Sequence, residues 1–273
     1  MSLALSHPVP VIDRYAHASE AIIGARDHQE DYCLFAFADG GPGNERTGET
    51  GAGELVAVLA DGMGGHVAGE LASQTACTSF AEAYCSARVA PADRLSGALK
   101  TCNEALAKAI SQDETLDGMG CTLIGAAFGE RGMRWVSVGD SHLYLFRDRK
   151  LYLLNEDHSM APVIDEMASK GLLGNEEARN HPRRHLLRSA LTGTKIEMID
   201  IGSKLLKLET GDCIIMATDG IEAISNDAIA AILADRERAD PAEIVAALVD
   251  AIENVNDPLQ DNTTVMAIQP KFA

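Results

Sequence analysis

Basic and aromatic residues are scarce in this sequence of 273 residues. Lys and Arg number 23 against 41 Asp and Glu, which gives a formal net charge of −18, and Phe, Trp and Tyr together make up 4% of the chain. A surface this acidic repels phosphate backbones and anionic lipid. We therefore expect neither nucleic acid nor a membrane surface as a partner.

Long apolar runs and paired cysteines are also missing. No run approaches the roughly 20 apolar residues of a membrane-spanning helix, and the first residues lack the basic and apolar regions of a signal peptide. The 6 cysteines include no C-x-x-C pair, and several stand among apolar residues, as Cys213 does before Ile214. We interpret them as reduced core residues and predict a cytoplasmic protein.

Three routes of phosphate chemistry are excluded by motifs that the sequence lacks. No cysteine has an arginine six residues later, so the thiolate loop C-x₅-R is absent. No Asp-x-Asp occurs, which removes the aspartyl-phosphate route. No Gly-Lys-Ser or Gly-Lys-Thr occurs either, so the chain is not a P-loop NTPase.

Two kinds of segment alternate along the chain. Short apolar runs bounded by turn residues predict strands, and longer Ala-rich stretches predict helices. Expected strands are Tyr32–Ala38, Leu55–Ala60, Thr122–Phe128, Arg134–Val138, His142–Arg147, Lys150–Leu154, Lys204–Leu208, Cys213–Thr218 and Thr263–Ile268. Expected helices are Ala68–Ala87, Asp93–Ser111, Pro162–Lys170, Asn175–Arg179, Asp227–Leu233 and Pro241–Val255. Hairpin-linked strands with helices between them predict an α+β fold of antiparallel sheets in one domain, residues 1–273.

Aspartates stand at the ends of several expected strands. They are Asp61-Gly62 after Leu55–Ala60, Asp219-Gly220 after Cys213–Thr218, Asp140 after Gly139, and Asp261 before Thr263–Ile268. A following glycine lets backbone carbonyls approach a ligand closely. If these ends converge, hard oxygen donors surround one point, as Mg²⁺ and Mn²⁺ prefer. Asp-Gly is also a common turn signal, so a single pair is more often a turn, and only the whole set indicates a metal site.

A charged cluster, Arg26-Asp27-His28-Gln29-Glu30-Asp31, precedes the expected strand Tyr32–Ala38. One arginine beside acidic residues is usually a solvated turn. The functional alternative is a guanidinium for bidentate phosphate binding, accompanied by further carboxylates for a metal.

Six segments together resemble a known family. They are Arg26-x-x-Gln29-Glu30-Asp31, Asp61-Gly62-Met63-Gly64-Gly65-His66, Gly139-Asp140-Ser141, Asp157-His158-Ser159, Thr218-Asp219-Gly220 and Asp261-Asn262-Thr263-Thr264. In this order they resemble the metal-dependent protein serine/threonine phosphatases (the PPM or type 2C family), and its bacterial members most of all. The resemblance runs from about Gly24 to Ile268, nearly the whole chain.

The resemblance implies a fold, a metal centre and a role for each site residue. The expected fold is a central β-sandwich of two antiparallel sheets flanked by pairs of helices, in four layers, with two Mn²⁺ or Mg²⁺ ions at one end. Water between the ions would attack phosphorus without a covalent phosphoenzyme. The implied ligands are Asp61 as the bridge, the Gly62 carbonyl, Asp219 and Asp261 on one ion, Glu30 and Asp31 on the other side, and Asp140 with Asp219 at a third metal, which bacterial members often bind. Arg26 would grip the substrate phosphate.

Two positions depart from the family pattern. Gln29 stands where Asn is usual. Met63 stands where many eukaryotic members carry a histidine that acts as a general acid, which leaves the leaving-group acid open. His66 is a candidate catalytic residue by its position alone.

A segment between strands, residues 159–193, resembles the flap of the family. Its basic cluster contains Arg183 and Arg184. These side chains either begin a solvated helix or bind the phosphopeptide and its acidic flanks.

Two function classes stay open, with a third behind them. The first is an active phosphatase, working as a monomer on phosphorylated Ser/Thr proteins opposite a Ser/Thr kinase. The second is a pseudophosphatase that only binds. Retention of Asp61, Asp219, Asp261 and Arg26 favours the enzyme, since degenerate members usually lose at least one. A hydrolase of small phosphate esters is the third possibility, which kinetics on phosphoproteins and metabolites would separate.

Overall fold

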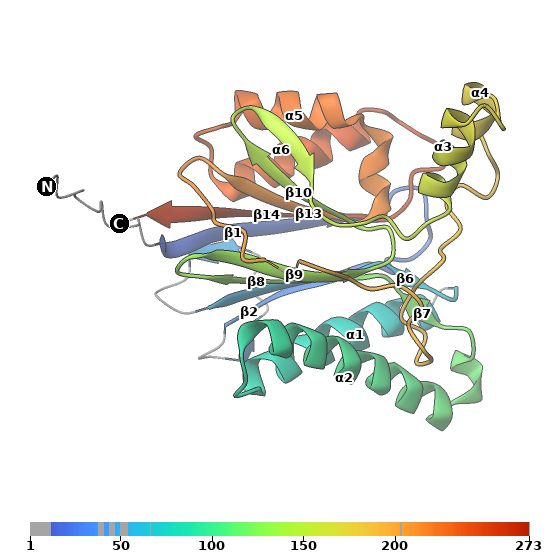
Figure 1. The fold of residues 1–273 in the computed structure, drawn as a ribbon, viewed down its shortest axis with the longest axis horizontal. Coiled ribbons are helices and arrows are strands. Elements are labelled where there is room, and N and C mark those ends of the chain that lie inside the picture. Colours follow the sequence, from blue (N-terminus) through green and yellow to red (C-terminus); the bar gives the residue numbers. More distant parts are fainter. Residues whose placement is uncertain are drawn as a thin grey trace, which may run out of the picture.

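Two antiparallel sheets of six strands each lie face to face at the centre of this computed structural model, and helices cover both outer faces (Figure 1). The structure describes residues 12–37, 41–43, 47–49, 54–65, 67–202 and 204–272. The arrangement confirms the predicted α+β sandwich with paired helices on each side.

The strands and helices have the following bounds. The strands are β1 Ile12–Ile22, β2 Tyr32–Phe37, β3 Gly41–Gly43, β4 Thr47–Glu49, β5 Leu55–Ala60, β6 Gly62–Met63, β7 Gly120–Cys121, β8 Leu123–Gly129, β9 Gly132–Val138, β10 His142–Arg147, β11 Lys150–Leu153, β12 Asp200–Ile201, β13 Cys213–Ala217 and β14 Thr263–Phe272. The helices are α1 Val67–Ser86, α2 Pro91–Gln112, α3 Ala161–Ser169, α4 Asn175–Arg179, α5 Asn226–Asp235 and α6 Pro241–Glu253, with 3₁₀ turns at Glu114–Leu116 and Asp219–Ala223.

Each sheet mixes strands from distant parts of the sequence. One sheet has the order β11-β10-β13-β14-β1-β4 and the other has the order β12-β9-β8-β5-β2-β3, while β6 and β7 pair separately. Every pairing is antiparallel, as in β5 with β8 and β13 with β14. Neighbouring strands therefore place the end of one beside the start of the next.

The alternation of side chains along β5 explains why this strand is apolar throughout. Val56, Val58 and Ala60 pack against α1 and α2, whereas Leu55, Ala57 and Leu59 pack between the two sheets. Successive side chains of a strand point to opposite faces, so a strand covered on both sides needs apolar residues at every position.

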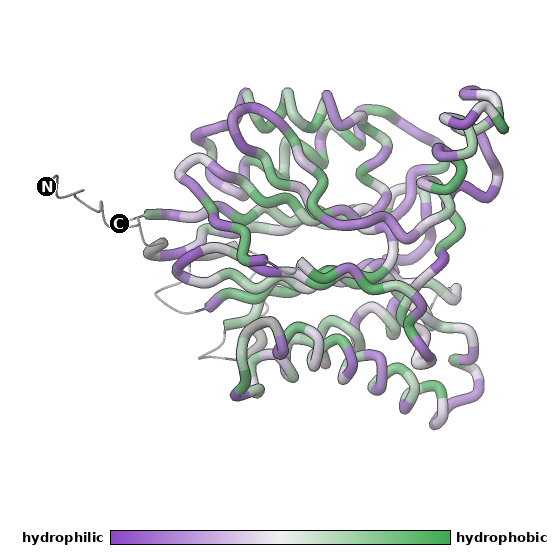
Figure 2. The backbone as a smooth tube through the Cα atoms, viewed as in Figure 1, coloured by the Kyte–Doolittle hydropathy of each residue, from purple (hydrophilic) through white to green (hydrophobic). Residues whose placement is uncertain are grey.

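The same division holds in the other sheet. Ile214 and Met216 of β13 face the inter-sheet core, and Cys213, Ile215 and Ala217 face α5 and α6. In Figure 2 the strands of the sandwich are mostly hydrophobic, and the outer turns of the helices are more hydrophilic. All 6 cysteines are free thiols and four of them are buried, as expected of core residues.

The helices α3 and α4 lie beyond one end of the sandwich, the end at which β6 and β7 also lie (Figure 1). Both belong to the segment 159–193 that we expected to form a flap. Within the part of the chain that the structure describes, none of the helices has the length and apolar character needed to cross a bilayer.

Two sequence predictions differ from the structure. The 11-residue strand β1 was not predicted, although it pairs with β14 along its length. The predicted strand Lys204–Leu208 forms only an isolated bridge between Leu206 and Met133.

Candidate active site

Strand ends from both sheets meet at one cleft of about 880 Å³. Asp61 follows β5 and Asp140 follows β9 by way of Gly139, in one sheet, and Asp219 follows β13 in the other. Asp261 comes just before β14, the antiparallel neighbour of β13, so its position lies at the same edge. The topology therefore brings the predicted aspartates together. The residues of the cleft include Arg26, Glu30, Asp61, Gly62, Asp140, Asp219 and Asp261.

A further carboxylate, Asp31, lies buried behind the cleft at the start of β2. Its Oδ2 accepts hydrogen bonds from the hydroxyls of Thr218 and Thr264, at 2.8 and 2.9 Å. Its Oδ1 is buried and has no hydrogen-bond partner among the described residues. Burial raises the pKa of Asp31 to about 7, helped by Asp219 and Asp261 and opposed by the two threonine hydroxyls.

The other carboxylates of the cleft repel one another. Burial, followed by the charges of Asp31, Asp219 and Asp140, holds the pKa of Asp61 well above its usual range. Burial and the charge of Asp219 raise the pKa of Asp140 to about 7. Burial and the charge of Asp261 also raise the pKa of Asp219, whose buried Oδ1 has no partner in the described chain. Such a cluster needs protons or cations to neutralise it.

The donor set fits hard divalent cations. All of its side chains are carboxylates. Two of their buried oxygens, Asp31 Oδ1 and Asp219 Oδ1, have no hydrogen-bond partner among the described residues. Mg²⁺ and Mn²⁺ prefer oxygen ligands of this kind. Among the described residues no three His, Cys, Asp or Glu side chains already stand in the close grouping of a finished metal site. The carboxylates instead surround an open cleft.

The glycines after Asp61 and Asp219 allow backbone segments to touch. A Cβ on Gly62 would lie 2.1 Å from the Gly69 carbonyl oxygen and 2.5 Å from that of Glu30. A Cβ on Gly220 would lie 2.1 Å from the Thr263 hydroxyl oxygen. Neither pair forms a hairpin turn, because Gly62 begins β6 and Gly220 lies in a 3₁₀ turn. A hairpin turn therefore describes neither pair, and the metal-binding role of Asp61 and Asp219 stays a prediction.

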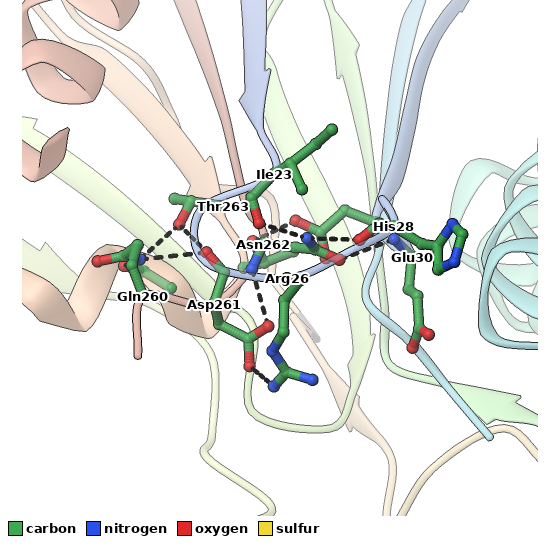
Figure 3. A network of polar contacts seen from close by, with 11 residues as sticks. Ile23, Arg26, His28, Glu30, Gln260, Asp261, Asn262 and Thr263 are labelled. Carbon is green, nitrogen blue, oxygen red and sulfur yellow. Dashed lines mark hydrogen bonds and ion pairs between the residues drawn. The ribbon is translucent and has the colours of Figure 1, made fainter. Parts of the chain in front are cut away.

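Arg26 lies on an irregular loop, residues 23–31, at the rim of the cleft. Its guanidinium pairs with the carboxylate of Asp261 (Figure 3). The Arg26 side chain is 57% exposed and that of Asp261 is 38% exposed, so the pair is open to solvent. Asp261, a predicted metal ligand, thus shares its carboxylate with the predicted phosphate-binding arginine.

The segment 159–193 reaches the cleft through residues 185–190, which contribute His185 and Arg188 to its wall. The Nε of Arg188 donates to the Ser159 carbonyl at 2.8 Å. Arg184 instead binds both carboxylate oxygens of Asp165 on α3, at 2.7 and 2.9 Å. Within the described chain, neither Arg184 nor Arg183 is among the residues that line the cleft.

A second segment that forms a wall of the cleft was not identified from the sequence. Residues 192–197 contribute Thr192, Thr194, Lys195 and Glu197 to the cleft. Asn103 of α2 holds this segment, because its side chain donates to Thr194 O at 2.6 Å and accepts from Gly193 N at 2.9 Å. The segment reaches the site because it packs beside α2, and a local sequence pattern does not predict such a tertiary contact.

Met63 and three histidines bear on the identity of the leaving-group acid. Met63 lines the cleft and has no titratable proton. His66 lies outside the described residues. His28 and His185 line the cleft, and neither was selected from the sequence.

Known proteins are similar to this chain in sequence and in fold. The sequence model of the family Protein phosphatase 2C matches residues 37–262. Serine/threonine protein phosphatase PstP of Mycobacterium tuberculosis is 32% identical over 182 residues, which are 65% of this chain and 34% of that protein. The chain thus spans about a third of the length of that relative.

Two solved structures have the same architecture. The crystal structure of the Mycobacterium tuberculosis phosphatase PstP/Ppp superposes with a TM-score of 0.74 at 26% identity, covering 94% of this chain and 99% of the other. The catalytic domain of PstP in complex with two manganese ions superposes with a TM-score of 0.72 at 26% identity, covering 94% and 98%. From the match over residues 37–262 and the shared fold, this chain belongs to the protein phosphatase 2C family.

Proposed function

We propose that the protein is a metal-dependent phosphatase that hydrolyses phosphoserine and phosphothreonine in proteins. The observation that carries the proposal is the meeting of Asp61, Asp140 and Asp219 with Arg26 around one cleft, in a chain of this family. The relatives named as serine/threonine phosphatases, and the PstP domain bound to two manganese ions, support the same activity here.

The carboxylates of the cleft are the proposed metal ligands. Asp61 and the Gly62 carbonyl would hold two Mn²⁺ or Mg²⁺ ions together with the remaining proposed ligands, which are Glu30, Asp31, Asp140, Asp219 and Asp261. When bound, the ions would supply an activated water and positive charge for the phosphate.

Electrostatics explains why the substrate needs this cation layer. A phosphate dianion approaching Asp61, Asp140 and Asp219 alone meets charge of its own sign at short range. Arg26 stands at the rim, where its guanidinium can bind two phosphate oxygens and orient the phosphorus over the carboxylates. When the Arg26–Asp261 ion pair opens, the Asp261 carboxylate would become available to a metal ion and the Arg26 guanidinium to the phosphate.

Several further features belong to the same proposal. We propose that segment 159–193 acts as a flap, that the protein works in the cytoplasm, and that it opposes a Ser/Thr kinase in signalling. The free thiols agree with a reducing compartment. That the protein works as a monomer stays a prediction. The pseudophosphatase alternative gains no support, since Asp61, Asp219, Asp261 and Arg26 all line the cleft.

The decisive experiment measures phosphate release from a phosphothreonine peptide. Metal-stripped protein would be titrated with Mn²⁺, Mg²⁺ and Ca²⁺, beside Asp219→Asn and the control Asp235→Asn, whose side chain is 80% exposed on α5. We expect Mn²⁺ or Mg²⁺ to be required and Asp219→Asn to lose at least roughly 100-fold, with the control unchanged. Tight Mn²⁺ binding without turnover in the wild type would support the pseudophosphatase. Turnover of small phosphate esters alone would favour a metabolite hydrolase.

A further inference from the structure

One buried amide holds the loop that carries Arg26. The side chain of Asn262, 5% exposed at the start of β14, donates to the Ile23 carbonyl at 2.8 Å and to the His28 carbonyl at 2.9 Å. Its Oδ1 accepts from the Glu30 backbone N–H at 2.8 Å. Figure 3 shows the carboxamide between the two ends of this loop. Both donor hydrogens of the amide are thereby used.

The two carbonyls bracket Arg26 in the sequence. Ile23 and His28 lie on either side of it, so one side chain fixes both ends of the turn from which the arginine projects. The loop has no regular secondary structure between β1 and β2. The loop is also linked to the segment before β14 by the bond from Ala25 N to Gln260 O at 2.7 Å and by the Arg26–Asp261 ion pair. Asn262 is the side chain that binds the backbone on both sides of Arg26.

The chemistry of the position favours asparagine. Two carbonyls and one N–H converge on it, and a carboxamide offers two donors and an acceptor in one plane. Aspartate has the same shape but no donor, and its charge would face two carbonyl oxygens. Alanine would leave two carbonyls and one N–H without their partner, which is costly at a buried site.

Asn262 is hydrogen-bonded to Asp261, a proposed metal ligand, through its backbone and not through its side chain. The backbone N–H of Asn262 donates to Asp261 Oδ1 at 2.8 Å. A change of the Asn262 side chain leaves that bond available. The loop and the carboxylate can therefore be perturbed separately.

We propose that Asn262 is a positioning residue for Arg26: its carboxamide ties the loop of residues 23–30 to the start of β14 and so sets the guanidinium over the carboxylate cleft. The proposal rests on the phosphatase activity proposed above, in which Arg26 binds the phosphate. Asn262 touches neither substrate nor metal in this role. It acts through the backbone of the loop.

A double-variant cycle on the full chain tests the proposal. kcat/KM for a phosphothreonine peptide would be measured with saturating Mn²⁺ for the wild type, Asn262→Ala, Arg26→Ala and the double variant. A misplaced guanidinium costs about 100-fold, so we expect Asn262→Ala to lose roughly that factor. In the Arg26→Ala background the same change should cost less than about 3-fold, because the arginine it positions is gone.

A matched amide serves as control. Asn155 is also buried, and its side chain accepts from Leu143 N at 2.8 Å and donates to Ser141 O at 2.9 Å, away from the Arg26 loop. Asn155→Ala loses comparable hydrogen bonds, yet its effect on kcat/KM should be the same with or without Arg26. Asn262→Asp should behave as Asn262→Ala does.

Hydrogen exchange on the metal-free protein gives a readout that is independent of turnover. Asn262→Ala should lose protection at residues 24–30, above all at the Glu30 amide, while α1 and β5 stay protected. Unchanged exchange in this loop would overturn the proposal, as would an Asn262 effect that is equally large without Arg26. Weaker Mn²⁺ binding that accounts for the whole loss would overturn it too. Full activity of Arg26→Ala would instead remove Arg26 from the proposed mechanism, and the proposal with it.

Discussion

At the scale of single residues, the cleft depends on glycines as much as on carboxylates. Gly62 and Gly220 let backbone segments pack where any side chain would collide with a carbonyl or hydroxyl oxygen. The sequence identified both positions, but for a different reason, the approach of a ligand. Which atoms come close to a glycine is decided by the tertiary fold, so a local pattern cannot show it.

A pair of glycine substitutions tests this role. Gly62→Ala would place a Cβ 2.1 Å from the Gly69 carbonyl oxygen, whereas Gly97 in α2 has open space where its Cβ would be. We expect Gly62→Ala to lower the free energy of unfolding by at least about 2 kcal/mol. Gly97→Ala should raise it by about 0.5–1 kcal/mol, because alanine favours helix. Urea denaturation of both variants measures the difference, and equal stability of the two would contradict the packing role.

At the scale of elements, the continuously apolar strands were predictable, and β1, which has no continuous apolar run, was not. β5 and β13 are covered on both faces, so their continuous apolar runs mark them in the sequence. β1 contains Ala16 and Ala18, which lack strand propensity. It is a strand because β14 pairs with it and α6 packs against it, and Ala18 lies in the core shared with that helix. Because tertiary contacts stabilise β1 as a strand, its local sequence does not predict it.

In the segment 159–193, too, the sequence alone does not show which side chains reach the site. Its basic cluster was recognised, but only the fold decides which arginine faces the cleft. Arg184 is bound to Asp165 on α3, while Arg188 is anchored at Ser159 and lines the cleft. The role of Arg183 and Arg184 in substrate binding stays a prediction, and we propose Arg188, which lines the cleft, as a further candidate for it.

Charge removal at these arginines gives the corresponding prediction. Arg188→Gln should raise KM for a phosphothreonine peptide by about 5- to 10-fold, because a charge-assisted hydrogen bond to the substrate is lost. kcat on p-nitrophenyl phosphate, which has no peptide flanks, should change less than about 2-fold. Arg183→Gln is the matched control and should leave both values unchanged. A larger effect of Arg183→Gln on the peptide would restore the original assignment.

At the scale of the whole molecule, the antiparallel sandwich gathers negative charge at one end. The end of each strand lies beside the start of its neighbour, so Asp31, Asp61 and Asp219 meet although they are far apart in sequence. The chain as a whole has a net charge of −18, so its overall charge has the same sign as the cluster and does not offset it. The metal-free protein therefore bears a destabilising charge cluster that depends on pH.

The sign of this dependence follows from the raised pKa values. Burial raises the pKa of both Asp31 and Asp140 to about 7, above the ordinary value of about 4 that holds in the unfolded chain. Between pH 8 and 6.5 the folded state takes up protons that the unfolded state does not bind, so stability rises as the pH falls. Burial lowers the pKa of His158, so this histidine contributes with the opposite sign, and the two aspartates outnumber it.

Thermal unfolding in EDTA checks the expectation. Two groups with a pKa of about 7 contribute about 1–2 kcal/mol between pH 8 and 6.5, which is about 3–6 °C in Tm for a chain of this size. Asp31→Asn removes one of these charges, so it should raise Tm at pH 8 and flatten the profile. Saturating Mn²⁺ should reverse the slope, because the ions bind deprotonated carboxylates and stabilise the folded state more at pH 8. A metal-free Tm that is flat or rises with pH, with the same profile in Mn²⁺, would mean that these carboxylates neither share charge nor hold the ions.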